Sequence, residues 1–81
     1  MTAIQIAPVS SKPETLEEAA YPARWQLEVN GRRLPVTNLF DIHGDMTDQP
    51  IRAHRVVAYA GPGKWMVYAC EPHEIEPYTR P

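Results

Sequence analysis

The sequence has a single cysteine, no long hydrophobic run and only a small excess of charge. One cysteine cannot form an internal disulfide or supply a four-cysteine zinc site. No apolar run reaches the ~20 residues of a membrane-spanning helix, and the N-terminus lacks a signal-peptide pattern. The net charge of −2 argues against a general nucleic-acid binder but leaves room for a local basic face. These absences predict a cytoplasmic protein without a disulfide framework.

Length and proline content divide the chain. A sequence of 81 residues supports one small domain with a thin core, because so short a chain hides only roughly 60–65% of its unfolded surface. Six of the nine prolines lie near the ends, at positions 8, 13, 22, 72, 77 and 81. We therefore expect an N-terminal arm (residues 1–23), a small β domain (24–70) and a Pro-rich C-terminal tail without regular structure (71–81).

The arm contains one helix signal. Ser11 followed by Glu14 fits a capping box, and Pro13 is tolerated in a first helical turn. The pattern predicts a short helix over Leu16 to Ala20. So short a helix is marginal in water, so this one needs a surface to lie against.

The clearest local signal is a first hairpin. Two alternating segments, 25–29 and 32–36, flank Asn30-Gly31, a pair typical of a type I′ turn. A two-residue loop predicts that Val29 lies opposite Arg32 and Trp25 opposite Val36. The apolar face then carries Trp25, Leu27, Val29, Leu34 and Val36. The other face carries Gln26, Glu28, Arg33 and Pro35, which predicts one buried and one wet face.

A second hairpin is predicted over residues 54–70. Pro62-Gly63 suits the centre of a type II turn, and we expect a four-residue loop over 61–64. That register pairs Ala60 with Trp65 and Arg55 with Cys70. Both faces are then apolar, so one covers the core and the other needs a cover as well. The cover is the folded-back arm, a second copy of the chain or a different partner.

These elements predict a mainly β protein, with a small α+β fold as the alternative. The expected architecture is a four-stranded, mainly antiparallel sheet or a small open barrel. We expect a non-enzymatic interaction module, an accessory, regulatory or structural subunit that docks on a protein partner or self-associates. No cofactor is expected. The predicted partner-binding residues are Arg55, Val57, Tyr59, Met66 and Tyr68.

The sequence lacks the combination of residues that a catalytic site requires. Cys70 has no evident base, and the Gly61-Pro62-Gly63 turn precedes a strand and loses an N–H to its proline, unlike a phosphate-binding loop. Asp41, His43 and Asp45 form the pattern of a polar turn more than that of a cation site.

Two other functions remain open. Cations interleaved with aromatic residues on a sheet are typical of proteins that bind single-stranded nucleic acid. The candidate residues for that function are Arg24, Arg32, Arg33, Arg52 and Lys64. A small zinc site is the further alternative, since one sulfur and three imidazoles suit tetrahedral zinc. Its ligands would be His43, His54, Cys70 and His73.

Overall fold

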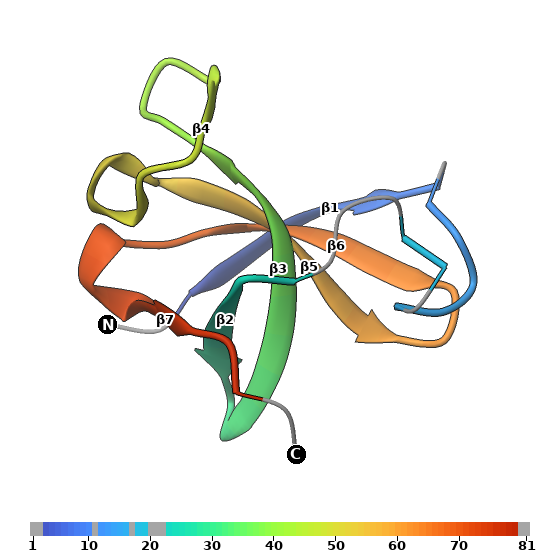
Figure 1. Ribbon diagram of the computed structural model, residues 1–81. Helices are drawn as coiled ribbons and strands as arrows, with labels where there is room; N and C mark the ends of the chain where they lie inside the picture. Colours follow the sequence, from blue (N-terminus) through green and yellow to red (C-terminus); the bar gives the residue numbers. More distant parts are fainter. Residues whose placement is uncertain (1–2, 11, 17, 20–22, 80–81) are drawn as a thin grey trace.

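The fold consists mainly of β-strands, with a long connection between the first two and shorter ones between the others (Figure 1). The computed structural model describes residues 3–10, 12–16, 18–19 and 23–79. Its strands are β1 (Ile4–Val9), β2 (Trp25–Val29), β3 (Arg32–Phe40), β4 (Met46–Thr47), β5 (Arg55–Gly61), β6 (Lys64–Ala69) and β7 (Ile75–Pro77). Two 3-10 turns accompany them, η1 (Pro50–Arg52) and η2 (Pro72–Glu74). These residues contain no α-helix, and so none that could cross a membrane.

The strands form one open antiparallel sheet in the order β1-β6-β5-β3-β2-β7, with β4 paired to β3. The mainly β, antiparallel fold predicted from the sequence is confirmed. The predicted number of four strands is wrong, because the described sheet has seven. The additional strands include β1 and β7, which come from the two terminal segments and form the two edges of the sheet.

The first hairpin has the predicted register. Val29 lies opposite Arg32, and Trp25 opposite Val36. Asn30 and Gly31 both have positive φ, 51° and 80°, as a type I′ turn requires. The local turn signal was therefore sufficient to align these two strands.

The predicted register of the second hairpin agrees with the structure next to the turn but is wrong by one residue from Tyr59 to Arg55. Gly61 pairs with Lys64, so that only Pro62 and Gly63 remain in the loop, and Gly63 has the positive φ of 68° expected at the third position of a type II turn. A bulge between Tyr59 and Gly61 absorbs the extra residue. Beyond the bulge, a shift of one residue changes which side chains of β5 and β6 share a face.

The shift exchanges the partners across the hairpin. Val56 lies opposite Tyr68 and Arg55 opposite Ala69, whereas the sequence predicted Tyr68 opposite Val57 and Cys70 opposite Arg55. Both faces of the hairpin are nevertheless apolar, as predicted. One face belongs to the main core, and the other lies beneath the N-terminal arm.

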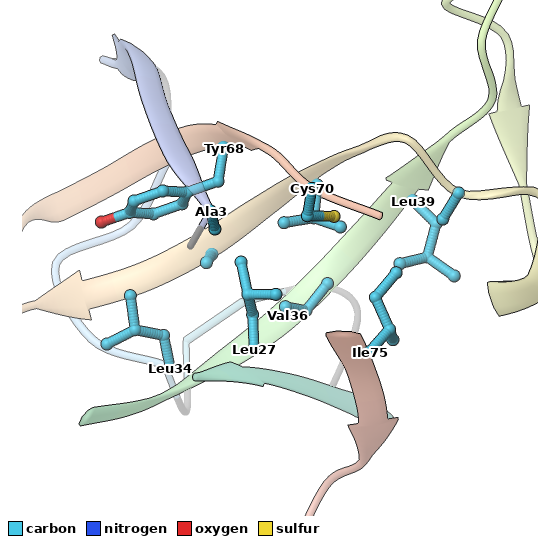
Figure 2. Close-up of a cluster of buried hydrophobic side chains, with 11 residues drawn as sticks. Ala3, Leu27, Leu34, Val36, Leu39, Tyr68, Cys70 and Ile75 are labelled. Carbon is cyan, nitrogen blue, oxygen red and sulfur yellow. The ribbon is translucent and has the colours of Figure 1, made fainter. Parts of the chain in front are cut away.

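The main core lies on the concave face of the sheet (Figure 2). Ala3, which precedes edge strand β1, and Ile75, on the opposite edge strand β7, belong to the same buried cluster. The open sheet therefore curls around one core. Its buried members are Ala3, Leu27, Leu34, Val36, Leu39, Ala53, Val56, Ala58, Tyr68, Cys70 and Ile75.

The N-terminal arm covers the other face of the second hairpin. The Trp65 indole Nε1 donates a hydrogen bond to the Pro13 carbonyl oxygen at 2.7 Å, and the Lys12 ammonium lies 5.3 Å from the Trp65 ring centroid. The Gly63 N–H donates to the Glu14 carbonyl oxygen at 2.7 Å. Trp65 is only 1% exposed as a result. Of the three covers that the sequence left open, the arm supplies the one over Trp65.

The predicted helix in the arm is not formed by the residues that the structure describes. Residues 12–16 and 18–19 form bends and a turn, while Ser11, Glu17 and Ala20 lie outside the described residues. The carbonyl groups of Pro13 and Glu14 explain this, because they accept hydrogen bonds from Trp65 and Gly63 instead of from a following helical turn.

The C-terminal tail is also structured, contrary to the prediction. The turn η2 leads into β7, in which Ile75 pairs with Leu27 and is buried. The tail also covers Gln26, predicted to be wet but only 4% exposed. Gln26 is satisfied there, since its Nε2 donates to Glu76 at 3.4 Å and its Oε1 accepts from the Thr79 N–H at 3.2 Å.

Candidate functional site

A pocket of about 370 Å³ opens beside the turns of the two hairpins. Polar residues and residues of the main core line it together. We call it the turn-end pocket, and its lining residues are Gln5, Val29, Asn30, Arg32, Leu34, Ala60, Lys64, Met66 and Tyr68.

Strand alternation brings these side chains to one face. Residues two apart in a strand point the same way, so Arg32 shares the face of Leu34, and Lys64 shares that of Tyr68. Gln5 on β1 lies opposite Tyr68. Leu34 and Tyr68 are each 4% exposed, and in Figure 2 the Tyr68 hydroxyl points away from Cys70. The two cations therefore stand at the margin of the core.

The turn-end pocket is locally positive. Arg32 and Lys64 line it, and none of its lining residues is acidic, although the chain as a whole has a net charge of −2. The Arg32 Nη2 donates to the Ala60 carbonyl oxygen at 3.4 Å, which holds the guanidinium beside β5. Such a cluster of one charge sign attracts anions to the pocket.

A second hollow, of about 280 Å³, lies between the start of β2 and strand β4. Here Arg24 and Asp48 provide charges of opposite sign, and Met46 is 69% exposed. The Lys12 ammonium donates a hydrogen bond to the nearby Asn38 Oδ1 at 3.1 Å. Opposite charges leave this hollow without the positive field of the turn-end pocket.

The five residues predicted for nucleic-acid binding do not form one surface. Arg32 and Lys64 meet at the turn-end pocket, whereas Arg33 follows Arg32 in β3 and points to the opposite face. Arg24 lines the second hollow, and Arg52 belongs to η1. The sequence missed Gln5 and Asn30 as pocket residues, because one was assigned to the arm and the other to a turn.

The predicted partner-binding residues do not share one face either. The bulge separates Val57 and Tyr59 from Met66 and Tyr68, which point toward the main core. Val57 is 6% exposed, and Tyr59 packs on Trp65 with ring centroids 5.0 Å apart. Of the five, only Arg55 is well exposed. The five residues therefore form no common exposed surface, and their role in binding a partner stays a prediction.

The structure does not assemble the alternative zinc site. The observed register does place His54 opposite Cys70, whose N–H donates to the His54 carbonyl oxygen at 3.0 Å. Within the described residues, however, no three His, Cys, Asp or Glu side chains lie close enough together to hold a metal ion. Burial, with the charges of Glu74 and Glu71, also raises the pKa of the Cys70 thiol to about 11, which disfavours the thiolate that zinc requires.

The raised pKa makes Cys70 a testable marker of the folded core. A disulfide reagent at pH 8 is expected to react about 100-fold more slowly with the folded protein than with the urea-unfolded protein, because the thiol pKa is about 11 instead of 9.0. The raised pKa favours the protonated thiol in the folded state. Its contribution to stability is therefore present below about pH 9 and is lost as the pH rises toward about 11. Equal rates in the folded and unfolded protein would contradict this environment.

The Asp41 loop is a polar turn, as predicted. The Asp41 Oδ1 accepts hydrogen bonds from the N–H groups of His43 at 2.9 Å and Asp45 at 3.0 Å, and Gly44 has a φ of 86°. The hydrogen bond from Asp45, followed by the contributions of His43, holds the pKa of Asp41 below 3.8. The carboxylate is thus occupied with the backbone of its own loop.

The two edges of the sheet differ in their protection. The edge strand β7 has three residues, of which Glu76 is charged and Pro77 lacks an N–H. The opposite edge strand, β1, has six residues and no charge, and its Ile4 and Ile6 are 64% and 47% exposed. Edge strands of natural proteins are usually blunted by charge or proline, and β1 has only Pro8 and a bulge at Ile6. The sequence missed this strand because it was assigned to the arm.

Comparisons with protein-family models, with curated proteins and with solved structures find no match for this chain. Its functional assignment therefore rests on the geometry of the described residues.

Proposed function

We propose that this protein is a non-enzymatic interaction module that associates with a second copy of itself through the outer edge of β1, which pairs with no strand of the described residues other than β6. The observation that carries the proposal is an uncharged edge strand with two exposed isoleucines, Ile4 and Ile6. Neither residue belongs to the buried core cluster. Their side chains therefore lie outside the packed core of the single chain.

A second copy is the occupant that fits this edge best. Two β1 strands related by a two-fold axis run antiparallel, which continues the antiparallel order of the sheet. Identical charged strands would repel each other, whereas β1 carries no charge. The missing N–H of Pro8 concentrates the new pairing on the first part of the strand.

The titratable residues support a role without catalysis. The only cysteine is buried, and its raised pKa keeps it protonated at neutral pH. The Asp41 carboxylate is engaged by its own loop, and the described residues bring together no cluster of three His, Cys, Asp or Glu side chains. The Cys70 thiol is thus not prepared as a nucleophile, nor the Asp41 carboxylate as a base.

The proposal predicts a reversible dimer that a charged edge abolishes. One strand pair makes a small interface, and small interfaces belong to weak, transient complexes. Sedimentation equilibrium over a concentration series is therefore expected to show the mass rising from 9.2 kDa toward twice that value. The double variant Ile4→Lys/Ile6→Lys is expected to remain monomeric, because paired lysines oppose each other across the two-fold axis.

The matched control is Ile42→Lys/Ile51→Lys, which adds the same two charges at isoleucines that are 73% and 79% exposed and lie far from β1 in sequence. This control is expected to dimerise like the wild type. A wild type that stays monomeric at about 1 mM, where association worth only about 4 kcal/mol is detectable, contradicts the proposal. Equal loss of association in both double variants also contradicts it.

A further inference from the structure

The geometry points to the turn-end pocket as a binding site for a phosphate ester with a flat, largely apolar body of nucleotide size. This inference goes beyond the proposed self-association, because it concerns the concave face of the sheet and not the outer edge of β1. It rests on four features of the pocket: paired cations with no acid among the described lining residues, an apolar floor, amide groups at the rim, and a volume that matches the ligand.

The cations provide the anion-binding part. Arg32 and Lys64 enter the pocket from different hairpins, and among the described residues no acidic side chain lines it to neutralise them. Two acidic residues near the turns do not line the pocket: Glu28 lies opposite Arg33 on the other face of the first hairpin, and the Glu14 carboxylate lies beside Gly63. A planar guanidinium and a point-like ammonium are complementary donors for phosphate oxygens.

The floor of the pocket provides an apolar surface, which favours an organic ligand over a bare anion. Val29, Leu34, Ala60 and Met66 line the pocket with carbon, and all of them belong to the core cluster or pack against it. Because the core holds the floor in place, a flat apolar body can bury surface there without first ordering the site. Inorganic phosphate alone would leave this surface exposed to water.

The rim provides hydrogen-bonding groups that are not charged. Gln5 and Asn30 each carry an amide that can donate and accept, and both are exposed at the pocket. The volume of about 370 Å³ lies within the range of small-molecule pockets, roughly 300–1,000 Å³. Two positive charges, an apolar floor and two amides together match the parts of a nucleotide.

The test is a titration of the whole chain, followed by backbone amide NMR shifts, with adenosine monophosphate, adenosine and inorganic phosphate as probes. Adenosine monophosphate is expected to shift resonances around Gln5, Asn30, Arg32 and Lys64. Adenosine lacks the charge and inorganic phosphate lacks the body, so each is expected to bind at least about tenfold more weakly. Low salt is used because screening weakens exposed charge pairs.

Two double variants separate the site from the general charge of the protein. Arg32→Gln/Lys64→Gln is expected to weaken binding of adenosine monophosphate more than about tenfold. Arg33→Gln/Arg52→Gln removes the same two charges from outside the pocket and is expected to bind like the wild type. All four residues are exposed, so both variants are expected to keep the wild-type pattern of resonance dispersion.

A short single-stranded oligonucleotide then distinguishes the source of the phosphate. Tighter binding with a steeper salt dependence identifies a strand, and binding no tighter than that of the mononucleotide identifies a free ligand. Either result supports the pocket. The inference is overturned if adenosine monophosphate causes no localised shifts, if inorganic phosphate binds as tightly, or if both double variants weaken binding equally.

Discussion

Replacing Trp65 by alanine is expected to remove a large part of the free energy of unfolding of this protein. The side chain is 1% exposed, packs on Tyr59 and receives the folded-back arm. Removing a buried tryptophan costs about 3–5 kcal/mol. A domain of 81 residues has a total stability of only about 4–12 kcal/mol. Thermal unfolding followed by circular dichroism is expected to show a fall in Tm of more than about 12 °C.

The variant Trp65→Phe separates the packing of the ring from the hydrogen bond to the arm. Phenylalanine keeps an aromatic ring against Tyr59 but cannot donate to the Pro13 carbonyl oxygen, a bond of 2.7 Å in the native protein. Its expected cost is about 1–2 kcal/mol, with faster cleavage after Glu14 by a glutamate-specific protease. A wild-type cleavage rate in this variant would show that the indole N–H does not hold the arm.

The second large effect is expected from Leu27→Ala on the opposite face of the sheet. Leu27 is fully buried, lies opposite Leu34 and Ile75 on its two neighbouring strands, and belongs to the main core cluster. Shortening a buried leucine costs about 2–5 kcal/mol, because it removes apolar contacts and leaves a cavity. Urea unfolding followed by tryptophan fluorescence measures the loss directly as a lower midpoint.

The control for Leu27 is Ile42→Ala, a truncation of similar size at a side chain that is 73% exposed. Exposed substitutions of this kind usually change stability by no more than about 0.5 kcal/mol. If both variants unfold at the same urea concentration, Leu27 does not occupy the centre of a packed core. If Leu27→Ala lowers the free energy of unfolding strongly and Trp65→Phe lowers it only slightly, the two faces of the sheet stabilise the fold through different interactions. The core around Leu27 then acts through packing, and the indole N–H of Trp65 adds one hydrogen bond to the arm.

The two hairpins show how far local patterns reach. The first was predictable in full because Asn30-Gly31 accepts positive φ at both turn positions, and a two-residue loop leaves one register. The second contains an equally clear turn at Pro62-Gly63, but its register also depends on the bulge before Gly61. The alternation of polar and apolar residues could not reveal this bulge. Both faces of the hairpin are apolar, so either register buries apolar side chains.

The candidate sites were less predictable than the strands. The sequence marked Arg32 and Lys64 as cations beside turns, but not their shared pocket, because they belong to different hairpins. Ile4 and Ile6 alternate with Gln5 and carry a weak strand signal, which the neighbouring Pro8 obscured. Only the pairing of β1 with β6 turns that segment into the edge of a sheet.

The sequence by itself determined the class of the fold, the first hairpin and its register, and the apolar character of both faces of the second. These features depend on turn conformations and on alternation within a few residues, which a short segment already contains. The tertiary structure alone decided the incorporation of β1 and β7, the placement of the arm over Trp65, and the convergence of Arg32 and Lys64. Such contacts join residues far apart in the chain, and they form only when the sheet curls around a common core.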